Sequence, residues 1–163
     1  MFFMKSNVVI YTDGACSKNP GKGGYGIVLL YKKENGEQVQ KNVSKGFQNT
    51  TNNRMELLAV IDALNLLKKP CKVTLCTDSK YVTEAINKGW LESWVKNNWR
   101  TNSKSKVKNV DLWQKFIQAK KDHDIEFIWV KGHHENEYNN LCDKLAVTAR
   151  EKPNLEIDEG FEL

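Results

Sequence analysis

The chain has 163 residues, of which 40% are hydrophobic and 28% are charged. This length suits one domain with one hydrophobic core. No apolar run approaches the length that spans a bilayer, the first residues are too short for a secretory signal, and the four cysteines show no metal-ligand spacing. We therefore expect a cytoplasmic protein with reduced cysteines and no membrane attachment.

The formal net charge of +5 is unevenly distributed. Residues 151–163 contain five acidic residues and one lysine, so this segment carries −4 and residues 1–150 carry +9. A basic body indicates a polyanionic partner. Because the acidic segment has a proline and few strong core residues, we expect a domain over residues 1–150 and a flexible tail over residues 151–163.

The first half of the domain is predicted to be an antiparallel meander followed by a helix. Alternating apolar residues and glycine-rich or asparagine-rich turns predict strands at Asn7–Thr12, Tyr25–Tyr31 and Gln38–Gly46. An apolar stripe from Leu57 to Leu67 then predicts a helix that begins near Thr51 and is closed by Pro70.

The second half alternates strands and helices around a basic segment. Strands are predicted at Val73–Thr77 and Ile125–Val130, and helices at Ser79–Asn87, Val110–Lys121 and Asn139–Arg150. Residues 88–108 hold six basic residues, one acidic residue and three of the five tryptophans. This order of elements indicates an α/β domain with a mixed sheet.

Four carboxylates are the candidate functional groups. Asp13 and Asp78 each end an apolar, β-rich run, whereas Glu56 and Asp143 lie inside helical patterns. If the four converged, they would repel one another, and divalent cations with a preference for oxygen ligands, such as Mg²⁺ or Mn²⁺, would resolve the repulsion. Taken singly, Asp78 and Asp143 are more typical of helix caps or solvated charges.

The motifs around these acids resemble the type 1 ribonuclease H family, in its bacterial ribonuclease HI form. They are YTDGAC with SKNPGKGGYG, TTNNRMELLA, TDSKYV, KNVDLW, and VKGH followed by NNLCDKLA, in that order from about Val8 to Arg150. The resemblance implies a ribonuclease H-like fold. Its five-stranded mixed sheet would have three antiparallel strands first and then two parallel ones, flanked by helices, with a basic protrusion.

The resemblance also implies an activity and its groups. The protein would be an endoribonuclease that hydrolyses the RNA strand of RNA–DNA hybrids by two-metal-ion catalysis, leaving 5′-phosphate and 3′-hydroxyl ends. Asp13, Glu56, Asp78 and Asp143 would hold two Mg²⁺ ions, with Mn²⁺ as a substitute. His133 would assist proton transfer or product departure, and the register of VKGH favours it over His134. We expect a monomer without a small-molecule cofactor.

Two sets of residues are expected to bind the hybrid. At the RNA strand, whose 2′-hydroxyls distinguish it from DNA, the resemblance implies Gly14, Cys16, Asn19 and Asn52. At the DNA strand it implies Thr51, Asn53, Trp90, Trp99, Arg100, Lys104, Lys106 and Lys108. Simpler alternatives are helix capping for Asn52 and Asn53, an Asn-Pro turn for Asn19, and core packing for the tryptophans, above all Trp94.

Two positions depart from the family pattern. Lys80 stands where the family often has glutamine, and Asn140 stands where bacterial relatives often have an acid. Lys80 would either reach a phosphate or weaken metal binding, and we expect a raised magnesium requirement.

Two other functions stay open. A non-catalytic binding module would have a broken acidic set, whereas here the set is whole. Another nuclease of the same fold, acting on DNA, would typically lack the basic segment and the sequence context of Glu56. A digest that compares hybrid, duplex DNA and duplex RNA separates all three.

Overall fold

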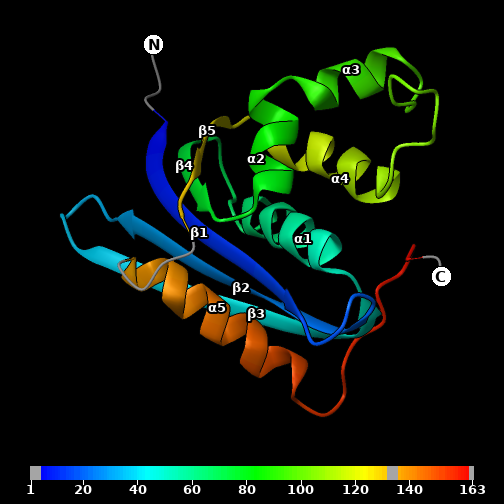
Figure 1. Ribbon diagram of the computed structural model, residues 1–163. Helices are drawn as coiled ribbons and strands as arrows, with labels where there is room; N and C mark the ends of the chain where they lie inside the picture. Colours follow the sequence, from blue (N-terminus) through cyan, green and yellow to red (C-terminus); the bar gives the residue numbers. More distant parts are fainter. Residues whose placement is uncertain (1–4, 132–135, 162–163) are drawn as a thin grey trace.

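A five-stranded mixed sheet organises the molecule, for which the computed structural model describes residues 5–131 and 136–161 (Figure 1). The strand order is β3-β2-β1-β4-β5. The strands β1 (Ser6–Cys16), β2 (Gly21–Lys32) and β3 (Gln38–Thr50) pair antiparallel, whereas β4 (Cys71–Thr77) and β5 (Asp124–Trp129) continue parallel to β1. The predicted sheet, three antiparallel strands followed by two parallel ones, is confirmed.

The helices lie on both faces of this sheet. In order they are α1 (Asn52–Asn65), α2 (Lys80–Asn87), α3 (Trp90–Lys96), α4 (Val110–Lys120) and α5 (Glu137–Arg150). Figure 1 shows α5 on one face and α1, α2 and α4 on the other, while α3 and the loop after it project from the body. None of the described helices has the length and the apolar character needed to cross a bilayer.

Alternation along β1 creates two apolar cores. Val8 and Ile10 belong to the larger core, which also contains the buried stripe of α1. Val9 and Tyr11 pack against the smaller core, together with Cys142 of α5. Successive strand residues point to opposite faces, so one short sequence pattern supports helices on both sides of the sheet.

The helix α5 lies almost directly on the backbone of β2. A Cβ atom at Gly26 would collide with the carbonyl oxygen of Cys142, so only glycine permits this approach. The helix begins at Glu137, earlier than predicted, because the Asn136 side chain accepts a hydrogen bond from the backbone N–H of Asn139. In contrast, α1 ends at Asn65 and not at Pro70.

A buried arginine joins three distant segments. Arg54 of α1 is 2% exposed, and its Nε donates to Asp158 Oδ2 at 2.7 Å. Its Nη1 and Nη2 donate to the Asp111 carboxylate of α4 at 2.9 and 2.8 Å. A buried guanidinium requires such partners, because an unpaired charge in the interior is costly. Arg54 therefore fixes α1 relative to α4 and to the C-terminal segment.

The C-terminal segment contacts the domain at several points up to Phe161, although most of its side chains are exposed. Asp158 also accepts a hydrogen bond from Thr50 Oγ1 at 2.6 Å, and Glu156 forms a parallel bridge with Phe47 of β3. One buried carboxylate thus takes the place of the apolar anchors that the segment lacks.

Replacing Asp158 by alanine is expected to lower the free energy of unfolding by about 3 kcal/mol, because Arg54 would lose one of two carboxylate partners for a buried charge. Urea denaturation measures the change. Glu159→Ala is the matched control, since this exposed side chain forms no ion pair among the described residues and should shift the value by less than about 0.5 kcal/mol. Equal losses in the two variants would contradict the anchoring role.

Candidate active site

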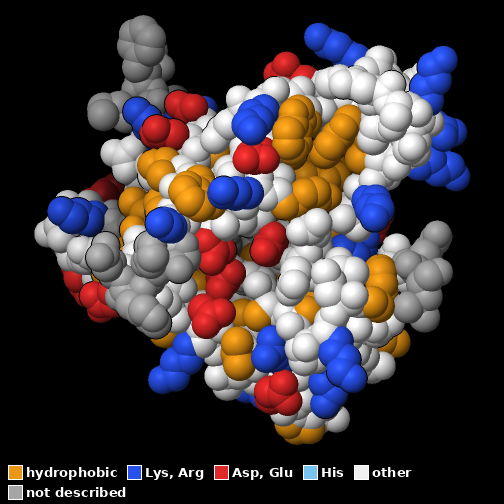
Figure 2. All heavy atoms as spheres, in the orientation of Figure 1, with side chains coloured by type: hydrophobic (Ala, Val, Ile, Leu, Met, Phe, Trp, Pro, Cys, Tyr) orange, Lys and Arg blue, Asp and Glu red, His pale blue; other side chains and the backbone are white. Residues whose placement is uncertain are grey.

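Four carboxylates from four elements meet where β1 and β4 end. Asp13 lies in β1, Asp78 directly follows β4, Glu56 lies in α1 and Asp143 lies in α5. The register of the parallel pair places Thr12 opposite Thr77, so the next residues, Asp13 and Asp78, become neighbours. Figure 2 shows acidic side chains gathered near the middle of the face that it presents. The electrostatic influence of Asp143 reaches both Asp13 and Asp78.

Glu56 reaches this cluster because α1 crosses directly over Gly14. A Cβ atom on Gly14 would lie 2.6 Å from the Glu56 backbone nitrogen and 2.7 Å from the Met55 carbonyl carbon. Ser79 donates its hydroxyl proton to Glu56 Oε2 at 2.5 Å and also caps α2 by accepting from the backbone N–H of Val82. Because Ser79 is the cap, the side chain of the preceding aspartate is left for the cluster.

Burial and mutual repulsion raise the pKa values of Asp13, Asp78 and Glu56. The pKa of Asp13 rises to about 9, chiefly through burial and then through the charges of Asp78 and Asp143. Burial raises the pKa of Asp78 as well, and Asp143 adds to the effect. The pKa of Glu56 rises to about 7 through burial, with Ser79 opposing the shift and Asp78 adding to it. At neutral pH, Asp13 and Asp78 therefore share a proton when no cation is bound.

The chemistry of this set fits hard divalent cations. All four side chains offer carboxylate oxygens, and none of them forms an ion pair with a lysine or arginine in the described part of the chain. Over residues 5–131 and 136–161, no three His, Cys, Asp or Glu side chains are already arranged to hold one ion. The cluster is thus an open one, of the kind in which water and substrate oxygens complete a Mg²⁺ shell. The predicted His133 lies outside the described residues.

The four residues predicted at the RNA strand lie together beside the cluster. The backbone N–H of Cys16 donates to Asn52 Oδ1 at 2.8 Å, and the backbone N–H of Asn52 donates to Asn19 Oδ1 at 3.1 Å. The carbonyl oxygens of both amides are therefore used within the protein. Their NH₂ groups make no hydrogen bond to any described residue, which leaves donors on this surface.

The predicted DNA-strand residues fall into two groups. Thr51 caps α1 by accepting from the backbone N–H of Arg54 at 3.3 Å, so the capping role that was the alternative for Asn52 and Asn53 belongs to Thr51. Thr51, Asn53 and Lys108 line a cavity of about 790 Å³ between α1, the start of α4 and the C-terminal segment. Asn109 and Asp111 also line this cavity, and their side chains bond Arg54.

The second group lies on α3 and the loop that follows it. Trp90 is 41% exposed, whereas Trp94 packs with its ring centroid 5.7 Å from that of Trp113. Trp99 is half-buried and also packs against the core, so only part of its ring is accessible. Arg100, Lys104, Lys106 and Lys108 are all exposed. Core packing of Trp94 is confirmed, and it extends to Trp99 as well.

The sequence reasoning did not anticipate Trp129. Its indole N–H donates to the backbone carbonyl of Asp78 at 3.0 Å, and the Lys80 ammonium lies 5.0 Å from its ring centroid. The sequence does place Trp129 near the end of a predicted strand. This position indicates a contact with Asp78 only once β4 and β5 are known to pair in parallel.

The sheet order and the carboxylates at the ends of two adjacent parallel strands define a nuclease of the ribonuclease H-like fold. The sequence model of the RNase H family matches residues 5–151. The ribonuclease H of Rippkaea orientalis (strain PCC 8801 / RF-1) is 50% identical over 155 residues, which cover 95% of this chain and 92% of that protein.

Solved structures agree with this match. LC9-RNase H1, described as a type 1 RNase H with the type 2 active-site motif, has a TM-score of 0.82 at 31% identity, over 92% of this chain and 74% of that one. LC11-RNase H1, solved in complex with RNA/DNA hybrid, has a TM-score of 0.60 at 25% identity, over 87% and 95% of the two chains. The chain belongs to the ribonuclease H family, whose activity is cleavage of the RNA strand of RNA–DNA hybrids.

In EDTA at pH 7, Asp13→Asn is expected to raise the free energy of unfolding by roughly 4 kcal/mol, since each pH unit above the ordinary pKa costs the wild type about 1.4 kcal/mol. The folded-state pKa of Asp13 lies above its ordinary value of 3.8, so the wild type loses stability as the pH rises from about 4 through about 9. The amide removes this loss, and the difference should vanish below pH 4.

Thermal unfolding over this pH range, with EDTA and with Mg²⁺, measures the effect. Mg²⁺ should stabilise the wild type and stabilise the variant much less, because ligand binding to the folded state shifts the unfolding equilibrium. Wild-type stability that is flat from pH 5 to pH 9 in EDTA would contradict the clustering of charge at Asp13.

Proposed function

We propose that the chain is an endoribonuclease that hydrolyses the RNA strand of RNA–DNA hybrids with two divalent metal ions, leaving 5′-phosphate and 3′-hydroxyl ends. The observation that carries the proposal is the placement of Asp13 and Asp78 at the neighbouring ends of β1 and β4. Burial, Asp78 and Asp143 together raise the pKa of Asp13 there. Such an accumulation of negative charge is costly without a cation, and it lies at the ends of parallel strands, where ligands bind in open α/β sheets.

Asp13, Glu56, Asp78 and Asp143 would hold the metal ions, either Mg²⁺ or Mn²⁺. When bound, such ions activate a water molecule and stabilise the leaving oxygen of a phosphodiester. Asp13 is the most buried of the four and has Asp78 and Asp143 as electrostatic neighbours, so it suits the shared position. Ser79 keeps Glu56 turned toward the cluster through its hydrogen bond. His133 would move a proton or assist product departure.

Recognition of the RNA strand would use the group formed by Gly14, Cys16, Asn19 and Asn52. The amide NH₂ groups of Asn19 and Asn52 can donate to 2′-hydroxyls, which DNA lacks. The hydrogen bonds that tie the two asparagines to each other and to β1 hold these donors in place before substrate arrives. Burial raises the pKa of the Cys16 thiol to about 11, so it is neutral and contributes no charge of its own.

The DNA strand would bind along the cavity lined by Thr51, Asn53 and Lys108 and then along α3 and its loop. Exposed lysines and arginines neutralise phosphates, and the exposed ring of Trp90 offers a stacking surface. These contacts read no base edges, so little sequence preference is expected. LC11-RNase H1, which is similar in fold, was solved in complex with RNA/DNA hybrid, and this supports a hybrid as the ligand.

The direct test is a digest with labelled substrates in Mg²⁺. The wild type should cut only the RNA strand of a hybrid and leave duplex DNA and duplex RNA intact, and Asp13→Asn should reduce the rate by at least about 10³-fold. Wild-type protein that binds the hybrid without cutting it in Mg²⁺ or Mn²⁺ would show a binding module instead. Cleavage of duplex DNA would show a different nuclease of the same fold.

Replacing Lys104, Lys106 and Lys108 together by glutamine is expected to raise KM while kcat stays within about twofold, because these charges bind substrate away from the reacting phosphate. The slope of log KM against log salt should fall by about two to three, or roughly one for each lost phosphate contact. An unchanged KM and an unchanged salt slope would show that this loop is not part of the binding surface.

A further inference from the structure

The surface where α2 meets the end of β5 carries basic and aromatic side chains, of which the proposed contacts use Trp90 alone. The Lys80 ammonium lies over the Trp129 ring, 5.0 Å from its centroid. Two turns further along α2, Lys88 lies over Trp90 at 5.5 Å. A shallow groove of about 220 Å³ runs between these pairs, lined by Lys80, Thr83, Glu84, Asn87, Lys88 and Trp129.

We propose that Lys80, held over Trp129, binds a phosphate of the RNA strand next to the bond that is cut. This inference rests on the proposed function and adds a binding residue to it. The Trp129 ring would position the lysine and would pack against the neighbouring sugar. Lys80 is then a residue that binds the substrate, and Trp129 is in part a positioning residue that holds Lys80 in place.

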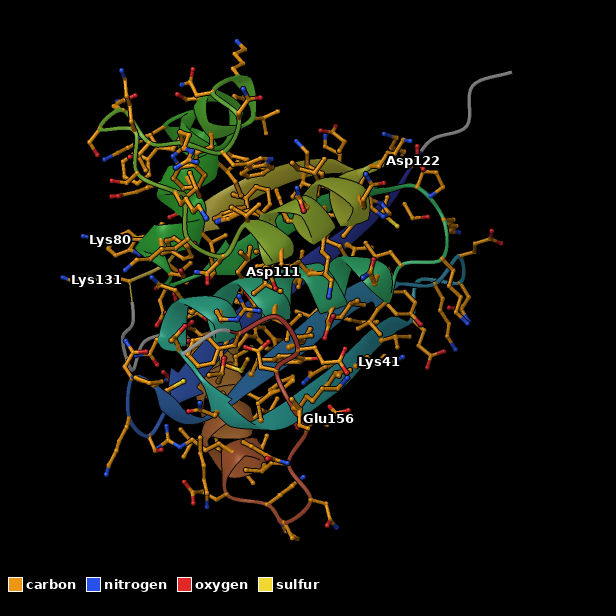
Figure 3. All side chains as sticks on the ribbon, turned by 90° about the vertical axis from the view of Figure 1, so that its right-hand side faces the viewer. Lys41, Lys80, Asp111, Asp122, Lys131 and Glu156 are labelled. Carbon is orange, nitrogen blue, oxygen red and sulfur yellow. The ribbon has the colours of Figure 1, made fainter. Side chains whose placement is uncertain are left out.

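Charge supports a phosphate as the occupant. Lys80 has no carboxylate partner within residues 5–131 and 136–161, and the groove's one acid, Glu84, already pairs with Lys88 at 3.5 Å. Figure 3 shows Lys80 and Lys131, which follows β5, pointing toward the same side of the molecule. An ammonium that rests on an aromatic face stays available to an anion, because the ring is a weak partner at an exposed site.

Position supports the strand that is cut. Lys80 follows Asp78 by two residues, and the Trp129 indole donates to the Asp78 carbonyl at 3.0 Å. The surface proposed for the DNA strand runs from the cavity between α1 and α4 to Trp90, which lies at the Lys88 end of the groove, whereas Lys80 lies at the end next to Asp78. A phosphate at Lys80 would therefore belong to the strand that passes over the carboxylates. The contact between Lys80 and the Trp129 ring also explains how a lysine two residues from Asp78 can bind a phosphate without forming an ion pair with Asp78.

The test compares Lys80→Gln with Lys41→Gln, which removes the same charge from an exposed site on β3. Figure 3 shows that Lys41 and Lys80 lie at opposite sides of the view. Lys80→Gln should raise KM roughly threefold to fivefold at low salt, leave kcat within about twofold, and reduce the slope of log KM against log salt by about one. Lys41→Gln should change none of these values.

Hybrids with one neutral methylphosphonate locate the contact. Scanned along both strands, the substitution should weaken binding of all three proteins alike at the proposed DNA-strand contacts. At one RNA-strand position beside the cut it should weaken binding of the wild type and Lys41→Gln, whereas Lys80→Gln should lose nothing further there. Trp129→Phe keeps a ring and removes the indole donor, so it should retain the salt slope, whereas Trp129→Leu should raise KM.

Three results would overturn the inference. They are a position on the DNA strand as the one whose sensitivity is lost in Lys80→Gln, identical scans for both lysine variants, and a changed Mg²⁺ half-saturation in Lys80→Gln with an unchanged salt slope. Binding is also scanned with Asp13→Asn as the common background. If the wild type cuts no hybrid, the proposed function fails, yet this binding scan still decides whether Lys80 contacts a phosphate.

Discussion

The pairing of the buried Arg54 is the interaction on which the geometry of the site depends. Arg54 precedes Glu56 by two residues in α1, and its guanidinium is held by Asp111 of α4 and Asp158 of the C-terminal segment. A buried guanidinium has few acceptable positions, because each N–H must find an acceptor. These partners set where α1 begins, and α1 in turn carries both Glu56 and the asparagine that bonds β1. One ion-pair network thus supports both Glu56 of the carboxylate cluster and the Asn52 contact with β1.

The carboxylate cluster lowers the stability of the fold that holds it. Like charges in a partly buried site destabilise the metal-free protein, and the raised pKa values of Asp13, Asp78 and Glu56 reflect that destabilisation. The apolar cores on both faces of the sheet offset the cost. Functional sites commonly retain such local strain, since the feature that weakens the empty protein prepares it for its ligand.

Sequence reasoning predicted the elements and the convergence of the acids, because strand alternation and motif order are local or family-wide signals. It did not foresee the anchoring of the C-terminal segment, because Asp158 and Arg54 are 104 residues apart and composition carries no information on such pairing. The partial burial of Trp99 was missed for a related reason, since a tryptophan in a basic loop has the same local pattern whether its ring packs or binds. The cap of α2 was ambiguous because Asp78 and Ser79 are both good capping residues.

The contact between Gly26 and α5 has a consequence for synthesis of the protein. The strand β2 is made early, but the helix that covers its glycine face lies more than a hundred residues later in the chain. On the ribosome, β2 and β3 must wait for residues 137–150 before that face is closed, and such long-range contacts are slow to form. Asp143 arrives with the same helix. A nascent chain therefore has three of the four carboxylates until α5 has left the ribosome, and the cluster is completed only when the glycine face of β2 is covered.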